Sequence, residues 1–152
     1  MADASADRPS SSATMVCEES EIRDAVKRAF QMSTAPTSTH AWSASTRLYS
    51  CRWSVPHGTL RLTVQDATDP VAGRGYYRRL HEDLAGVRPI RGMDSFGFPA
   101  FDTAAGDVVF LKDGKTLHVD ATRLPSSSLP PRFSRSEVAY SVASAVIGCW
   151  TE

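Results

Sequence analysis

Two hairpins constrain the fold of this 152-residue chain more than any other feature. In the first, apolar and polar residues alternate over 48–55 and again over 59–65, on either side of a turn at Pro56-His57-Gly58. Alternation with a period of two places one side of each strand in the core, here the side that carries Cys51 and Trp53. In the second hairpin Asp113-Gly114 separates two apolar runs, which is the strongest short-range hairpin signal. These patterns predict a mostly antiparallel sheet.

Three segments have the apolar spacing of helices. They are residues 18–30, residues 70–85 after Asp69-Pro70, and a last helix that Ser134 and Glu137 open as a capping box. Two glycines near the start of the second helix would delay its beginning to about residue 75.

A short strand around residues 98–101 precedes the second hairpin. The first strand of that hairpin, 108–111, has apolar residues on both of its faces, which predicts that both faces are buried. Residues 31–46 are rich in Ser, Thr and Ala and predict a loop. The predicted order is α-β-β-α-β-β-β-α. We therefore expect an α+β fold with a mostly antiparallel sheet and helices packed against it.

The chain reads as one domain over residues 16–152, preceded by a flexible tether over residues 1–15. Tethers of this composition commonly separate an exported domain from a lipid anchor or a membrane helix. We therefore expect Met1 to be an added start residue and an export signal to have been cut away, so that the tether is its remnant. No run approaches the roughly 20 apolar residues of a membrane span.

Charge excludes some functions. Seventeen basic residues balance seventeen acidic ones, which gives no electrostatic case for binding nucleic acid or an anionic membrane surface. The apolar fraction of 41% suffices for a packed core. The four histidines show no paired spacing typical of a metal site, and no segment has a cofactor motif.

Cys17, Cys51 and Cys149 are far apart in the sequence, which argues against a redox pair and favours a staple between distant elements in an oxidising compartment. We favour a Cys17–Cys51 disulfide, because it would tie the N-terminal segment to the hairpin. A Cys51–Cys149 disulfide is the alternative, since both side chains are expected to face the core.

The chain resembles small actinobacterial exported lipoproteins and sensor-like domains of unknown function. The resemblance spans about residues 16–151. It rests on Cys-Glu-Glu-Ser-Glu-Ile from Cys17, on Cys51-Arg52-Trp53, on Arg91-Gly92-Met93-Asp94, and on 109–114 with the closing Cys149-Trp150. It implies an α/β sandwich outside the membrane and no particular reaction, and in such domains the counterparts of Cys17 and Cys51 are commonly joined.

Two groups of residues are candidates for binding. Phe96, Phe98 and Phe101 lie on a segment with Gly and Pro, where aromatic side chains can be partly exposed. Arg74, Arg78 and Arg79 form a modest basic cluster that suits a phosphate, a carboxylate or an acidic partner.

No catalytic set stands out. The expected function is therefore that of a non-enzymatic, extracytoplasmic domain, tethered to the cell envelope, that binds a partner protein or a small envelope ligand. The alternatives are an enzyme or accessory protein of a biosynthetic or cell-wall pathway, and a sensor module of a membrane signalling protein.

Overall fold

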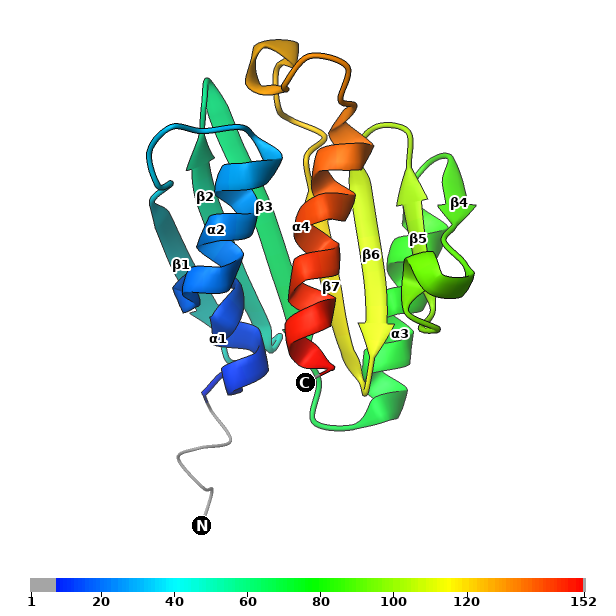
Figure 1. Ribbon diagram of the computed structural model, residues 1–152. Helices are drawn as coiled ribbons and strands as arrows, with labels where there is room; N and C mark the ends of the chain where they lie inside the picture. The colour runs from blue at the N-terminus through cyan, green and yellow to red at the C-terminus, as the bar shows by residue number, and fades with distance from the viewer. Residues whose placement is uncertain (1–7, 152) are drawn as a thin grey trace.

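The computed structural model describes residues 8–151, and within them seven strands form one antiparallel sheet (Figure 1). The strands are β1 (Ser38–Ser43), β2 (Leu48–Val55), β3 (Gly58–Asp66), β4 (Val87–Pro89), β5 (Ala100–Thr103), β6 (Asp107–Lys112) and β7 (Lys115–Asp120). Their order across the sheet is β1-β2-β3-β7-β6-β5-β4. Both predicted hairpins are confirmed, and the pairing of β3 with β7 joins them into one sheet.

Helices cover both faces of this sheet unequally. Within the described chain the helices are α1 (Ser11–Glu18), α2 (Ser20–Ala29), α3 (Pro70–Asp83) and α4 (Arg135–Trp150), with 3-10 turns η2 (Gly92–Ser95) and η3 (Ser126–Ser128). Figure 1 shows α1, α2 and α4 on the side toward the viewer and α3 behind the sheet. We call these sides the three-helix face and the α3 face. The α+β class is confirmed, but the structure adds α1, β1 and β4 to the predicted order.

The hydrophobic core lies between the sheet and the three helices. Alternate residues of β2 and β3 point into it, and the predicted inward side of Cys51 and Trp53 is confirmed. The β6 strand is buried along nearly its whole length, as its unbroken apolar run predicts. The α4 helix begins with the predicted capping box of Ser134 and Glu137 and packs beside α2.

The predicted tether over residues 1–15 is wrong from Ser11 onward, because this segment enters α1; residues 1–7 lie outside the described part. Ala13 and Val16 are fully buried. The indole N–H groups of Trp53 and Trp150 donate to carbonyls of α1, each at 2.9 Å. Tertiary contacts therefore fix a segment whose Ser-rich composition suggested disorder.

The predicted loop over residues 31–46 is also wrong in part, because it contains β1. This strand pairs with all but the last two residues of β2 and has mostly exposed side chains. Its polar sequence carries no period-two hydrophobic signal, so only the backbone pairing with β2 reveals it.

The α3 helix begins at Pro70, not near residue 75, with the Asp69 carboxylate accepting the Ala72 N–H at 2.9 Å. The glycine at 73 has a packing role. A Cβ atom there would stand 2.0 Å from the carbonyl oxygen of Gly114, in the β6–β7 turn. Gly73 lets the helix lie directly on that turn, which outweighs the low helix propensity of glycine.

The predicted Cys17–Cys51 disulfide is confirmed, and it joins the end of α1 to β2 with the two Cα atoms 5.5 Å apart. The Cys51–Cys149 alternative is wrong, since Cys149 lies half-buried outside the disulfide. None of the helices within residues 8–151 combines the length and apolar character that crossing a bilayer requires.

Candidate functional site

The three phenylalanines proposed as a binding surface do not share one. Phe101 is buried on the α3 face, where its ring packs edge-on against Tyr77 and His81 of α3. Phe98 is half-buried below the Lys112 ammonium group, and Phe96 keeps 43% of its surface exposed. The expectation of a partly exposed side chain is wrong for Phe101. The β5 strand begins at Ala100, which points to the three-helix face, so Phe101 points to the α3 face and is buried there.

The basic cluster lies on α3. Arg74, Arg78 and Arg79 are exposed on this helix, and Arg79 stacks over the Tyr76 ring at 5.8 Å from its centroid. Anion binding by these arginines stays a prediction.

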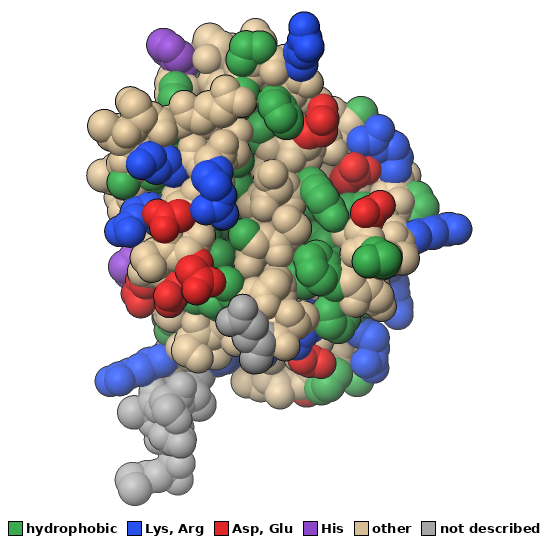
Figure 2. All heavy atoms as spheres, viewed as in Figure 1, with side chains coloured by type: hydrophobic (Ala, Val, Ile, Leu, Met, Phe, Trp, Pro, Cys, Tyr) green, Lys and Arg blue, Asp and Glu red, His purple; other side chains and the backbone are tan. Residues whose placement is uncertain are grey.

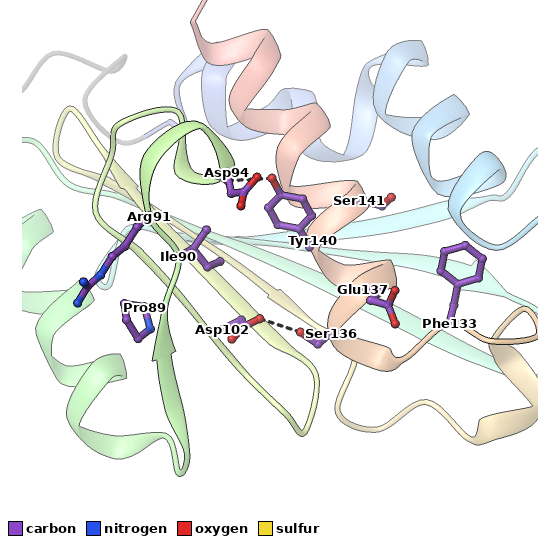
Figure 3. A pocket seen from close by; sticks show the side chains of 10 residues that line it. All are labelled: Pro89, Ile90, Arg91, Asp94, Asp102, Phe133, Ser136, Glu137, Tyr140 and Ser141. Carbon is purple, nitrogen blue, oxygen red and sulfur yellow. Dashed lines mark hydrogen bonds between the residues drawn. The ribbon is translucent and has the colours of Figure 1, made fainter.

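A groove of about 530 Å³ lies on the three-helix face, between α4 and the segment that runs from β4 into η2. Figure 3 shows the side chains that line it. They come from two stretches and from the middle of β5: Pro89, Ile90, Arg91 and Asp94; Phe133, Ser136, Glu137, Tyr140 and Ser141; and Asp102. The groove exists because α4 covers β6 and β7 but stops short of the sheet edge at β4 (Figure 1).

Asp102 is held at the β5 side of the groove by two donors from different elements. The Ser136 hydroxyl donates to Oδ2 at 3.0 Å, and the Arg88 guanidinium donates to Oδ1 at 2.9 Å. The α4 helix, β5 and the edge strand β4 are thereby tied together through one carboxylate. These bonds fix the width of the groove and leave Asp102 with its charge already paired.

One end of the groove is closed by Tyr140, whose hydroxyl donates to the backbone carbonyl of Asp94 at 2.8 Å (Figure 3). Burial and, to a lesser extent, the charge of Asp94 raise the pKa of Tyr140 above its usual value, so the phenol stays a donor at neutral pH. This bond anchors η2 to α4. Asp94 is thereby placed at the groove with its side chain exposed.

The groove combines apolar surface with negative charge. Phe133 is 46% exposed, and Met93, which stands on η2 next to Asp94, is 94% exposed. Asp94 and Glu137 make no ion pair with any residue from 8 to 151, although one Glu137 oxygen accepts the Ser134 N–H. Arg91, the basic lining residue, extends away from α4 (Figure 3). Figure 2 shows hydrophobic and acidic side chains next to one another along this flank of α4.

A second polar cluster lies on the α3 face at the ends of β6 and β7, where ligand atoms of Asp107, His118 and Asp120 all come within 4.8 Å of one another. Asp107 accepts from the Thr103 hydroxyl at 2.7 Å and lies 2.8 Å from His118 Nε2. Burial raises the pKa of Asp107, but the hydrogen bonds from His118 and Thr103 outweigh it and hold this pKa below its usual range.

These three residues are of the types that bind a divalent cation. However, both Asp107 oxygens already have partners, and Oδ1 of Asp120 accepts from the Thr122 N–H and hydroxyl at 2.8 and 2.6 Å. The arrangement is that of a hydrogen-bonded buried carboxylate, which holds the ends of β6 and β7 together.

The sequence carries a signal that could predict this cluster. A two-residue Asp113-Gly114 turn fixes the register of the hairpin, which places Asp107 opposite Asp120 and Val109 opposite His118. The groove has no such local signal, because its two walls come from segments about 40 residues apart that meet only through tertiary contacts such as those of Asp102.

No family model, curated protein or solved structure matches this chain. The function must therefore be inferred from the geometry of the chain itself.

Proposed function

We propose that this protein is a binding domain whose groove beside α4 takes a segment of a partner polypeptide that carries an apolar side chain next to a cationic one. The observation that carries the proposal is that apolar groove walls lie beside the carboxylates of Asp94 and Glu137, which form no ion pair with any residue from 8 to 151.

The apolar part of the ligand follows from the walls. Ile90 and Pro89 form one wall, and the rings of Phe133 and Tyr140 belong to the other. A volume of about 530 Å³ falls in the range of about 300–1,000 Å³ that is usual for ligand pockets. An aromatic or branched aliphatic side chain that enters would lose its hydration against these walls, which favours binding.

The cationic part follows from the charges. Asp94 is exposed at the groove and Glu137 lies on the α4 wall, while the charge of Asp102 is already paired with Arg88. A Lys or Arg beside the apolar side chain would reach these carboxylates. An acidic segment would be repelled, so the charges favour one class of partner over the other.

The groove has packed walls on α4 and β5 and an exposed segment at η2. Its α4 and β5 walls are parts of the packed helix and of the sheet, whereas η2, next to the lining residue Asp94, carries the exposed Met93 side chain. Methionine adapts to different apolar shapes, which suits a surface that receives side chains of a partner.

The Cys17–Cys51 disulfide supports an extracytoplasmic place of action, because disulfides persist in oxidising compartments. We include in the proposal that the domain works at the cell envelope, with a lipid anchor on the native protein. Fractionation of cells that express the natural gene tests this part: recovery of the protein with reduced cysteines in the cytosolic fraction would contradict it.

Short synthetic peptides of Gly and Ser with a central Phe-Lys, Phe-Glu or Phe-Ser pair test the groove. We expect the Phe-Lys peptide to bind the unmodified protein most tightly in a titration followed by amide NMR shifts. Asp94→Lys should reverse the order of the Phe-Lys and Phe-Glu peptides, each changing by about two- to fivefold in affinity, which is usual for an exposed charge pair. Phe133→Ser should weaken all three peptides alike.

Asp83→Lys is the matched control, because it makes the same charge change at an exposed residue at the end of α3, on the opposite face. Its peptide preferences should equal those of the unmodified protein. Equal binding of the three peptides, or the same response to Asp94→Lys and Asp83→Lys, would contradict the proposed site.

A further inference from the structure

Two arginines stand directly opposite one another on the α3 face. Arg52 on β2 is the cross-strand partner of Arg61 on β3. Their sequence neighbours Cys51, Trp53, Leu60 and Leu62 all point into the core, so both guanidinium groups project from the other side of the sheet. Like charges directly opposite one another destabilise a sheet, and an anion bound between them would remove that cost.

A third arginine joins this pair. Arg123, three residues beyond the end of β7, lines a pocket of about 270 Å³ together with Arg52, Arg61, Thr59 and Asp120. Within residues 8–151 none of the three guanidinium groups makes an ion pair or a side-chain hydrogen bond. Their donors are therefore available to a ligand, and each can present a bidentate pair.

The one acidic residue of the pocket does not neutralise it. Asp120 lies opposite Arg61 across the β3–β7 pairing, but Oδ1 of its carboxylate accepts from Thr122, at 2.8 and 2.6 Å, and it makes no ion pair with Arg61. Three guanidinium groups against one carboxylate leave the pocket with two surplus positive charges.

We propose that this pocket binds the phosphate group of a phosphomonoester or a phosphate polymer. The three guanidinium groups supply forked donors for the phosphate oxygens, and the Thr59 hydroxyl is a further donor on the same wall. The two surplus charges match the charge of a phosphomonoester near neutral pH. The site lies on the face of the sheet opposite the groove beside α4 and does not depend on the proposed function.

Calorimetric titration at low and moderate salt with inorganic phosphate, glycerol phosphate, polyphosphate and acetate tests the proposal. We expect the phosphate compounds to bind more tightly than acetate, with an affinity that falls as salt rises. Arg52→Gln and Arg123→Gln should each weaken phosphate binding on the order of tenfold, as expected for loss of a hydrogen bond between charged groups. Asp120→Asn should tighten it, because it removes a repelling charge and keeps an oxygen for Thr122.

Arg28→Gln is the control, since Arg28 is an exposed arginine of α2, on the opposite face of the sheet and outside this pocket. Tight binding of glycerol phosphate would identify a small phosphomonoester as the ligand, and tight binding of polyphosphate alone would identify a polymer. The proposal is overturned if phosphate binds no better than acetate, or if Arg28→Gln weakens binding as much as Arg52→Gln. Circular dichroism of each variant ensures that a loss of binding is read only from folded protein.

Discussion

The two faces of the sheet carry opposite chemistry on the same strands. On β3, Leu62 is fully buried under the three-helix face, while its neighbour Thr63 lies half-exposed on the α3 face. In the part of the chain that the structure describes, three helices and a disulfide close the first face, whereas α3 alone covers part of the second. The three-helix face therefore holds the fold together, and the α3 face over β2 and β3 is left to polar residues such as Arg52 and Arg61. Because successive residues of a strand point to opposite faces, different residues of β2 and β3 build the core and the proposed phosphate pocket.

Truncating the side chains of two neighbouring residues of β3 should distinguish the two faces most clearly. Leu62→Ala should lower the free energy of unfolding by about 3–5 kcal/mol, because it leaves a cavity in a fully buried site. Thr63→Ala should cost no more than about 1 kcal/mol. Urea unfolding measures both. Similar losses for the two variants would show that the faces do not differ as described.

The disulfide is the next largest contribution. Replacing both Cys17 and Cys51 by Ala should cost about 3–4 kcal/mol, as expected for a loop closed over 34 residues. Cys149→Ser is the control and should change stability by less than about 1 kcal/mol. Thermal unfolding with and without reductant measures the effect, and an unchanged midpoint in the double variant would contradict it.

On the α3 face, packing depends on one close approach. Gly73→Ala should destabilise the protein by about 1–3 kcal/mol, because the new Cβ would collide with the backbone of Gly114. Gly75→Ala on the same helix meets open space and should stabilise it by up to about 1 kcal/mol. The two variants should thus shift the unfolding midpoint in opposite directions, and shifts of the same sign would refute this packing.

The buried Asp107 carboxylate predicts a dependence on pH. Its folded-state pKa lies below its usual range, so the stability it contributes is complete above about pH 4, the unfolded value, and is lost as pH falls through the folded value. Asp107→Asn should be less stable near neutral pH and should lose less stability on acidification. Asp24→Asn, at an exposed residue of α2, is the control in urea unfolding at several pH values. Parallel pH profiles for Asp107→Asn and the unmodified protein would contradict the role of this carboxylate.

The smallest effect concerns a flaw in the three-helix face. The Tyr49 hydroxyl is buried and has no hydrogen-bond partner among residues 8–151, and burial, helped by Glu18, raises its pKa to about 12. Tyr49→Phe removes an unsatisfied polar group and should leave stability unchanged or raise it by less than about 1 kcal/mol. A clear fall in the thermal midpoint would show that this hydroxyl has a partner.

Local patterns sufficed for the elements that local contacts determine. The turn at Asp113-Gly114 determines the register of its hairpin, and the Ser134–Glu137 capping box marks the start of α4. The first hairpin differs, because Gly58 belongs to β3 and the turn has two residues, Pro56 and His57, not the three expected; this register places Arg52 opposite Arg61.

What the sequence could not supply are contacts between distant segments. Neither hairpin sequence predicts that β3 pairs with β7. This pairing brings Asp120 beside Arg61. The α1 helix has a Ser-rich start and is held by tryptophans from β2 and α4. The groove likewise depends on how far α4 lies from the sheet edge at β4. The hydrophobic pattern of the sequence predicts each element but not the distance between them.

The most direct test of this account follows backbone amide NMR shifts while the Phe-Lys peptide and then glycerol phosphate are added to the same sample. We expect the peptide to shift the amides around Ile90, Asp94 and Tyr140, and glycerol phosphate to shift those around Arg52, Arg61 and Arg123. Two separate sets of residues would support distinct sites on the two faces. A single shared set, or no response around α4 to the peptide, would contradict it.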